Sequence, residues 1–361
     1  MNDAGSAVEG ARTVRDEDMF DVEAVARWLR EEAEEHLRPD LGGTPEVRQF
    51  SGGASNLTYL LRYPAGRDLI LRRAPRGTKA KGAHDMGREY RIQRQLKPVF
   101  GYVPEMVGHC TDDDVIGAEF YVMERLDGVV PRADLSPDVL SVDQAERLCS
   151  NMIDVLVELH SVDAEAAGLG SLGKGLGYVR RQVDGWSARC RNAHTDDAPD
   201  FERVMGWLAA EQPDDVANCV IHNDFKLDNL VFDREDPTRV IGVLDWEMAT
   251  LGDPLMDLGG DLAFWVQADD DEEFQLFRRV PTHLPGMITR AEFVERYCER
   301  MGFTMTADQW RFYEIFGLFR LAVISQQIYY RYFHKQTTNE MFSLFGPAAH
   351  LAAKRIERLL P

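Results

Sequence analysis

The sequence is poor in cysteine and in basic residues, and both shortages limit what the chain can be. Its 361 residues include five cysteines, which lie far apart without a CxxC pair, so neither a disulfide framework nor a zinc site is indicated. Lys and Arg number 41 against 61 Asp and Glu, and the formal charge of -20 argues against nucleic acid or an anionic membrane as the main partner. No apolar run approaches the length that crosses a bilayer, and the first twenty residues lack the apolar stretch of a signal peptide. We therefore expect a cytoplasmic globular protein, and we expect it to be a monomer or a homodimer.

Hydrophobic patterning divides the chain into a small β-rich lobe and a larger helical lobe. Residues 1–20 are expected to form a disordered tail, and 21–38 have the apolar spacing of an amphipathic helix. Short β-type runs occupy 44–50, 57–64, 68–75, 106–110 and 119–126, with a helix at about 84–97 between the third and fourth. From about residue 143 the pattern is mostly helical, with β-type runs at 219–233 and 239–246. The sequence thus predicts an α+β protein with a first lobe and hinge at 21–128 and a second lobe at 129–361.

A glycine-rich segment in the second lobe resembles nucleotide-binding motifs only in its letters. GLGSLG (168–173) matches GxGxxG, and with Lys174 it also matches GxxxxGK. Both motifs require a strand before them and a helix that begins at them, whereas a helical pattern precedes this segment, and Gly175 stands where a P-loop needs Ser or Thr. We interpret 168–177 as a connection between helices and not as a dinucleotide or P-loop site.

Two polar segments in the second lobe follow apolar β-type runs and carry the candidate chemistry. VIHNDFKLDNLVFD (220–233) places Asp224 and Asn229 five residues apart on a loop, and VIGVLDWE ends its β-type run with Asp245. Side by side, the two loops would bring these three residues together. Mg²⁺ prefers oxygen ligands and commonly takes one or two protein groups plus substrate phosphates, so Asn229 and Asp245 are the expected metal ligands. Asp224 is then expected to accept the proton of a hydroxyl group.

HNDFKLDN resembles the catalytic loop HxDxxxxN of protein kinases and of the aminoglycoside phosphotransferase and choline kinase families, and LDWE resembles their metal-binding Asp segment. The likeness extends over most of the chain. It is strongest for the aminoglycoside phosphotransferase-like kinases, including the kinase-like domains fused to some acyl-CoA dehydrogenases, through HNDFKLDN, LDWEMATLGDP and RQVDGW. The resemblance implies a bilobal protein kinase-like fold, with a small antiparallel-sheet N-lobe and a larger, mainly helical C-lobe. It also implies that the γ-phosphate of ATP is transferred, with Mg²⁺, to a hydroxyl group of a small molecule.

The resemblance also assigns residues of the N-lobe to the nucleotide. The turn SGGASN, which comprises Ser51, Gly52, Gly53, Ala54, Ser55 and Asn56, takes the place of the loop that covers the phosphates. Where protein kinases carry Lys on the third strand, this sequence offers Arg72 or Arg73. Strand alternation favours Arg72, which we expect Glu89 to orient toward the phosphates. MERLDG (123–128) resembles the hinge that holds adenine, through Met123, Glu124 and Leu126.

Three residues around the catalytic loop receive roles from the same resemblance. Lys226, two residues after the base, is expected to contact the γ-phosphate as a second catalytic residue. His222 is expected to brace the loop through hydrogen bonds and not to react. Asp257 either supports the loop or caps a helix, and the sequence does not decide between the two.

The acceptor is left open by the sequence. The acidic run DDDEE (269–273) would suit the amines of an aminoglycoside, or it is a solvated loop. A set of arginines would instead suit an anionic acceptor such as a hydroxyacyl-CoA: Arg180, Arg181, Arg189, Arg320 and Arg331. The rival hypothesis to an active kinase is a binding or regulatory module that kept the fold but lost turnover. The presence of Asp224, Asn229 and Asp245 together argues against it.

Overall fold

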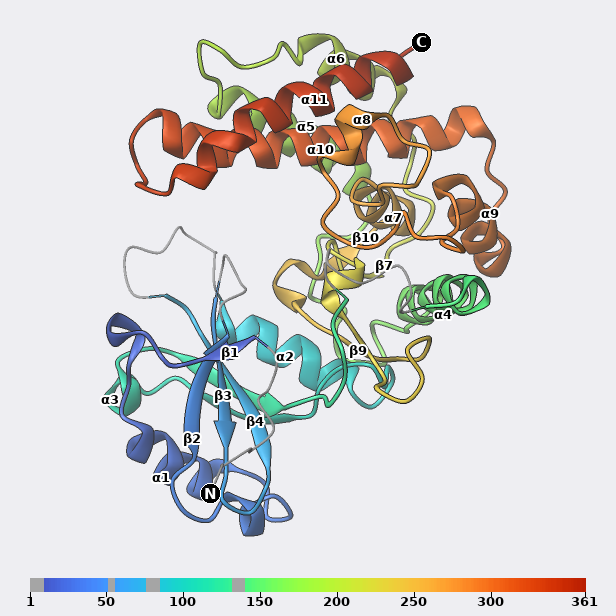
Figure 1. Cartoon of the computed structure of the whole chain (residues 1–361). Coiled ribbons are helices and arrows are strands. Elements are labelled where there is room, and N and C mark those ends of the chain that lie inside the picture. Colours follow the sequence, from blue (N-terminus) through green and yellow to red (C-terminus); the bar gives the residue numbers. More distant parts are fainter. Residues whose placement is uncertain (1–9, 51–55, 76–84, 132–139) are drawn as a thin grey trace. The chain divides into compact units, whose positions relative to one another are not determined.

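The computed structural model describes residues 10–50, 56–75, 85–131 and 140–361, and the chain divides into two compact units, Met1–Asp127 and Gly128–Pro361 (Figure 1). The first unit contains an antiparallel sheet and the second is mainly helical. The predicted α+β class is thereby confirmed. In the described parts of the chain, no helix is both long enough and apolar enough to cross a bilayer.

The N-terminal unit is built on a six-stranded antiparallel sheet with the order β1-β2-β3-β4-β6-β5. Its strands are β1 Ala11–Arg12, β2 Glu46–Phe50, β3 Leu57–Arg62, β4 Asp68–Arg73, β5 Met106–Cys110 and β6 Phe120–Glu124. Its α-helices are α1 Val22–Glu32, α2 Met86–Leu96 and the short α3 Asp113–Ile116. Helix α1 packs on one face of the sheet, and Met86 of α2 packs on the other.

Successive side chains of β4 point to opposite faces of the sheet, which determines which of them pack on the side of α1 and which on the side of α2. Leu69 and Leu71 are buried in the core that contains α1, whereas Ile70 is buried in the core that contains Met86 of α2. Because successive side chains of a strand point to opposite faces, Arg72 lies on the α2 side and Arg73 on the α1 side. The sheet therefore separates the two neighbouring arginines.

Two predictions for the start of the chain were wrong. Residues 10–20 are not a disordered tail, because β1 pairs with β2 and a 3-10 turn at Asp16–Asp18 buries Asp18, which accepts a 2.7 Å bond from Gln49 Nε2. Helix α1 ends at Glu32 and does not reach residue 38, since Ala33 is already extended, although Leu37 is still buried. The first error arises because a side chain of a distant strand holds Asp18, and the second because Arg38 donates to the carbonyl oxygens of Ala33 and Glu31 at the end of the helix. Local periodicity reports neither contact.

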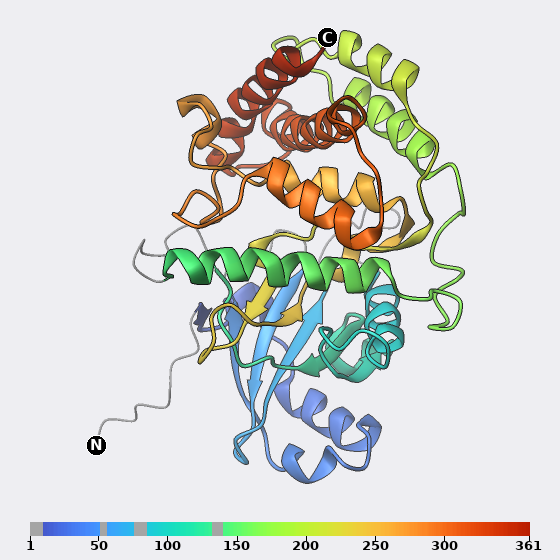
Figure 2. The same ribbon diagram turned by 90° about the vertical axis from the view of Figure 1, so that its right-hand side faces the viewer.

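The C-terminal unit consists of helices around two small two-stranded sheets, β7 with β10 and β8 with β9. The strands are β7 Cys219–Ile221, β8 Leu230–Phe232, β9 Val240–Val243 and β10 Thr250–Gly252. The helices are α4 Val142–His160, α5 Tyr178–Asn192, α6 Glu202–Glu211, α7 Pro254–Leu262, α8 Glu272–Gln275, α9 Arg290–Met301, α10 Ala307–Phe333 and α11 Phe345–Leu359. Figure 2 shows α9 lying along α4, where Arg300 bonds Asp154 and Arg296 bonds Glu146.

Helix α7 is held close against α10 by two glycines. A Cβ atom added to Gly317 of α10 would lie 2.0 Å from the carbonyl oxygen of Gly259 in α7, so the backbones touch where neither residue has a side chain. Helix α7 also accepts hydrogen bonds from the loop between β7 and β8, through Asp257 and Asp261. The segment 168–173 follows α4 and not a strand, and the next helix, α5, begins only at Tyr178, so the structure agrees with its exclusion as a nucleotide motif.

Candidate functional site

The candidate site of the C-terminal unit is the loop at residues 222–229, between β7 and β8, which we call the HNDFKLDN loop. Four successive backbone N–H groups at its start donate to side chains. Those of His222 and Asn223 donate to Asp257 at 2.9 and 2.6 Å, and that of Asp224 donates to His222 Nδ1 at 3.2 Å. The N–H of Phe225 donates to Asp261 Oδ1 at 2.8 Å. Side chains therefore fix the backbone on both sides of Asp224, and Asn223 is held at a positive φ of 65°.

His222 is a neutral brace. It is buried, its Nε2 donates to the carbonyl oxygen of Leu244 at 3.0 Å, and its Nδ1 accepts from Asp224. A carbonyl can only accept and a backbone N–H can only donate, so the proton is on Nε2. Burial lowers the pKa of His222, although the carboxylates of Asp257 and Asp224 oppose the shift. The contacts agree with the predicted bracing role.

Asp224 is held by two of the residues that were predicted to act with it. Asn229 Nδ2 donates to the carbonyl oxygen and to Oδ2 of Asp224 at 2.8 and 2.7 Å, and Lys226 Nζ lies 3.1 Å from Asp224 Oδ1. Burial of Lys226 opposes its charge, but the carboxylates of Asp224 and Asp228 outweigh this effect and raise its pKa. Lys226 is therefore a cation that neutralises Asp224.

The arrangement fits a magnesium ion that is completed by phosphates. The amide nitrogen of Asn229 donates to Asp224, so Oδ1 is the side-chain atom of Asn229 that is available to a cation. Asp245 follows β9 at a positive φ of 68°, and the N–H of its neighbour Leu244 donates to the carbonyl oxygen of Asn229 at 2.8 Å. Among the described residues, no group of three His, Cys, Asp or Glu side chains could hold a metal. A cation on Asn229 and Asp245 would thus need further oxygens, as Mg²⁺ takes from a nucleotide.

Asp257 supports the loop and is not the cap of its helix. The N-cap of α7 is Asp253, which accepts from Leu255 and Met256, whereas Asp257 accepts from the loop and from His160 Nε2 at 3.1 Å. Burial opposes ionisation of Asp257, but the hydrogen bonds that it accepts from His160 and from the backbone N–H of His222 outweigh burial and lower its pKa. Of the two roles left open by the sequence, the structure supports the first.

In the N-terminal unit, Arg72 and Glu89 form the predicted pair. Arg72 Nη1 lies 2.6 Å from Glu89 Oε1, and both side chains are buried. Arg73, on the opposite face of β4, donates instead to the carbonyl oxygen of Asp18 and to the hydroxyl of Tyr59, each at 2.8 Å. The geometry therefore agrees with the choice of Arg72 over Arg73 as the partner of Glu89.

The structure describes only some of the other residues that the sequence predicts to bind the nucleotide. Ser51, Gly52, Gly53, Ala54 and Ser55 lie outside the described residues, and Asn56 is buried at the start of β3. Met123 and Glu124 end β6, and Glu124 Oε1 accepts from the backbone N–H of Glu105 at 2.8 Å. Leu126 follows β6 and is partly exposed.

Sequence reasoning missed two buried ionisable side chains that hold the HNDFKLDN loop. Asp261 was not considered. Arg320, one of the arginines that would have suited an anionic acceptor, is buried in α10, and its Nη2 donates to the carbonyl oxygen of Asn223 at 2.6 Å. The available signals were an ionisable residue in the apolar run GLFRLAV and the four-residue spacing of Asp257 and Asp261 on one helix. Either signal indicates a buried polar partner.

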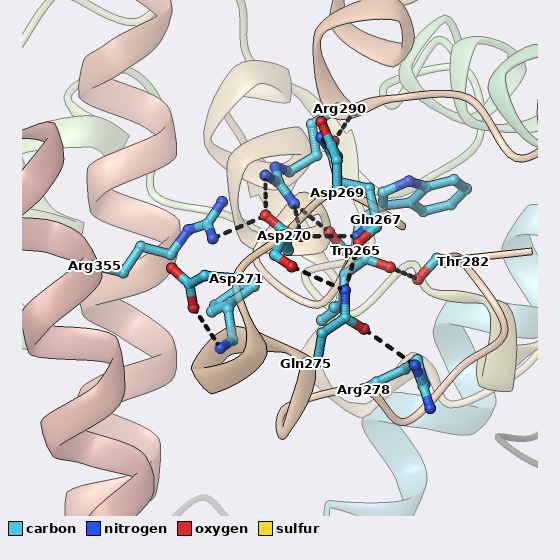
Figure 3. A network of polar contacts seen from close by, with 12 residues as sticks. Trp265, Gln267, Asp269, Asp270, Asp271, Gln275, Arg278, Thr282, Arg290 and Arg355 are labelled. Atoms are coloured by element: carbon cyan, nitrogen blue, oxygen red, sulfur yellow. Dashed lines mark hydrogen bonds and ion pairs between the residues drawn. The ribbon is translucent and has the colours of Figure 1, made fainter.

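The acidic run at 269–273 is occupied by basic side chains of its own unit (Figure 3). Arg290 makes two bonds to Asp270, at 2.6 and 2.7 Å, and Arg355 of α11 lies 2.9 Å from the same carboxylate. Lys354 bonds Glu273 at 2.6 Å. These pairs tie α8 to α11, so the hypothesis that this run attracts a cationic substrate loses its support.

Comparison with known proteins agrees with this geometry. A family model described as "Phosphotransferase enzyme family" matches residues 46–300. Acyl-CoA dehydrogenase family member 10 of Mus musculus is 36% identical over 330 residues, which cover 90% of this chain and 30% of that protein. Acyl-CoA dehydrogenase family member 11 of Rattus norvegicus is 33% identical over 328 residues, which cover 89% of this chain and 41% of that protein. The chain thus spans less than half the length of these two relatives.

Solved structures give the same family. A Ralstonia eutropha JMP134 protein, provisionally named an aminoglycoside phosphotransferase, is similar with a TM-score of 0.77 and 30% identity, and the match covers 94% of this chain and 99% of that one. Choline kinase from Cryptosporidium parvum Iowa II matches with a TM-score of 0.61 and 12% identity, over 94% and 98% of the two chains. At that identity, the second match shows the fold alone.

Proposed function

Since the chain belongs to the phosphotransferase enzyme family and is a small-molecule phosphotransferase, we propose that it transfers the γ-phosphate of ATP to a hydroxyl group, with Asp224 as the base. The observation that carries the proposal is the hydrogen-bonded set of Asp224, Asn229 and Lys226 on a loop whose backbone is fixed by buried side chains. A loop fixed to this degree suits phosphoryl transfer, because that reaction depends mainly on positioning and on neutralising charge.

Each residue has a distinct part in the proposed reaction. Asp224 accepts the hydroxyl proton of the acceptor, and Lys226 moves from Asp224 to the transferring phosphate as that charge arrives. Asn229 Oδ1 and the Asp245 carboxylate are the proposed protein ligands of Mg²⁺, which would neutralise the phosphate oxygens. In the N-terminal unit, Arg72 is proposed to contact the nucleotide phosphates, with Glu89 fixing the direction of its guanidinium. Met123, Glu124 and Leu126 are proposed to hold adenine.

Two acceptor classes follow from separate observations. The name of the Ralstonia eutropha protein suggests an aminoglycoside. The names of the mouse and rat relatives contain acyl-CoA, and a hydroxyacyl-CoA would add the hydroxyl group that the proposed reaction needs. Two observations favour this second class. The acidic run that would have attracted amines is paired with Arg290, Arg355 and Lys354, whereas Arg180 and Arg189 of α5 are exposed. Exposed guanidinium groups suit phosphate-bearing ligands.

The test is ADP release with a panel of acceptors that contains aminoglycosides, hydroxyacyl-CoA thioesters and the corresponding free hydroxy acids. The wild type, Asp224→Asn and Glu235→Ala are compared, because Glu235 is an exposed carboxylate in the turn after β8. We expect Asp224→Asn to bind Mg–ATP normally but to lose roughly 100-fold or more in kcat, the range of general base catalysis. Glu235→Ala should behave as wild type.

Two outcomes would contradict the proposal. If no hydroxylated acceptor is phosphorylated although Mg–ATP binds, the alternative of a binding or regulatory module gains support. If Asp224→Asn turns over a validated acceptor as fast as Glu235→Ala does, Asp224 is not the base.

A further inference from the structure

Asp257 and Asp261 lie one turn apart on α7 and bond the HNDFKLDN loop on either side of Asp224. Asp257 accepts from the N–H groups of His222 and Asn223, and Asp261 accepts from that of Phe225. Both side chains are buried, with 0% and 7% of Asp257 and Asp261 exposed. Two carboxylates at four-residue spacing on a helix are neighbours. Both cannot carry a charge there without a large electrostatic cost.

The hydrogen bonds distinguish the charged member of this pair from the neutral one. Asp257 accepts three bonds, two from the loop and one from His160, whose Nδ1 in turn contacts the hydroxyl of Tyr297 at 2.6 Å. Asp261 accepts one bond at Oδ1, and its buried Oδ2 has no hydrogen-bond partner among the described residues. Because donors stabilise the ionised form, Asp257 is the carboxylate and Asp261 is the acid.

The surroundings of Asp261 agree with a neutral side chain. It lines a small cavity whose other side chains are apolar except for Lys226, and the apolar ones include Met152, Leu262, Phe264, Trp265 and Phe293. Burial raises the pKa of Asp261 well above its ordinary value, the charges of Asp257 and Asp224 add to this shift, and Arg320 opposes it.

The other ionisable side chains around Asp261 form hydrogen bonds or ion pairs with groups other than Asp261. Lys226 is paired with Asp224, His222 with Leu244, and His160 with Asp257. Arg320 donates to the carbonyl oxygen of Asn223. Among the described residues, these pairings leave Asp261 without a cationic hydrogen-bond partner that would hold it in the ionised form.

We propose that Asp261 is a protonated positioning residue, which fixes the backbone after Asp224 without placing a second negative charge beside the base. The proposal deepens the function proposed above, since it takes Asp224 as the group that receives the hydroxyl proton. When Asp261 loses its proton at alkaline pH, the new charge faces Asp224 and Asp257, and repulsion displaces the loop that Phe225 anchors. The alkaline limb of the kcat profile therefore belongs to Asp261.

The protonation state is tested first, by infrared spectroscopy at pH 8, which does not depend on activity. Burial raises the pKa of Asp253 to about 6, so this other buried acid of α7 is ionised at that pH. We expect the wild type and the control variant Asp253→Asn to show the carbonyl band of a protonated carboxylic acid, and Asp261→Asn to lack it. Absence of the band from the wild type, or its persistence in Asp261→Asn, would overturn the proposal even if the variants fold poorly.

The positioning role is tested by the pH dependence of kcat with an accepted hydroxyl substrate. Asp261→Asn keeps a neutral acceptor for Phe225 N–H, so we expect kcat at pH 7 within about threefold of wild type and an alkaline limb that disappears. Asp261→Ala removes the acceptor and should lower kcat roughly 10- to 100-fold with KM for ATP unchanged, the effect of a small misplacement of the base. An alkaline limb that is identical in wild type and Asp261→Asn would refute the positioning role. If no substrate is ever turned over while the infrared band behaves as expected, the proposed function fails and the protonated Asp261 stands.

Discussion

Replacing Asp257 by Asn is the perturbation with the largest expected effect on the C-terminal unit. The side chain keeps its shape, but its new amide nitrogen must face donors, because Asp257 accepts from three N–H groups and Asn offers one oxygen. If the one remaining side-chain oxygen at position 257 accepts from the backbone N–H of Asn223, the backbone N–H of His222 and the Nε2–H of His160 lose their acceptor. Each buried donor without a partner costs roughly 1–3 kcal/mol, so we expect unfolding free energy to fall by about 3–5 kcal/mol.

The assay is equilibrium unfolding in urea at pH 7, followed by circular dichroism. Asp154→Asn is the matched control, because Asp154 bonds Arg300 at 2.6 Å on an exposed surface and such pairs contribute less than about 1 kcal/mol. In the wild type the lowered pKa of Asp257 gives stability above its unfolded pKa that is lost as pH falls through the folded pKa. The acid limb of the stability curve should therefore be weaker in Asp257→Asn. An Asp257→Asn protein within about 1 kcal/mol of Asp154→Asn would refute the reasoning.

Three further predictions concern other parts of the chain. Arg72→Met and Glu89→Gln should each raise KM for ATP roughly tenfold or more in steady-state assays, and the double variant should be no worse than Arg72→Met, because Glu89 acts through Arg72. Burial raises the pKa of Asp253 to about 6, so the stability that its protonated form contributes below its unfolded pKa is lost as pH rises through 6. Asp253→Asn should therefore flatten the plot of unfolding free energy against pH between pH 4 and 6. Urea titrations at each pH measure this. Asp270→Asn should lower unfolding free energy by about 3 kcal/mol because Arg290 and Arg355 both lose a charged partner, whereas Asp269→Asn, next to it and exposed, should change it by less than about 1 kcal/mol in the same assay.

The parts of the fold that were predicted from the sequence are those that local patterns determine. Strand β5 at Met106–Cys110 has its predicted bounds, and helix α2 at Met86–Leu96 lies within two residues of its predicted bounds, because β-type and helical periodicities are clear there. Strand β10 at Thr250–Gly252 was missed, since three residues give no periodicity and its pairing with β7 is made far along the chain. The segment around Asp18 was missed for the same reason.

The candidate site shows the same division. The grouping of Asp224, Lys226 and Asn229 in one loop could be predicted from the sequence, because these three residues lie within six positions of the chain. The side chains that hold the loop could not be predicted from the sequence, because Asp261 and Arg320 lie 36 and 97 positions away from the residues that they bond. Likewise, charge alone could not decide between a solvated loop and a contact for amines at the acidic run, whose partners Lys354 and Arg355 follow roughly 80 residues later in α11.

The most direct test of the central claim is a crystal structure of the protein with Mg²⁺ and a non-hydrolysable ATP analogue. The account predicts a metal ion at about 2.1 Å from Asn229 Oδ1 and from a carboxylate oxygen of Asp245, with phosphate oxygens completing its coordination. Asp224 should remain outside that coordination sphere, bonded to Asn229 Nδ2. A metal ion held by Asp224 itself, or one bound with the nucleotide away from Asn229 and Asp245, would contradict the account.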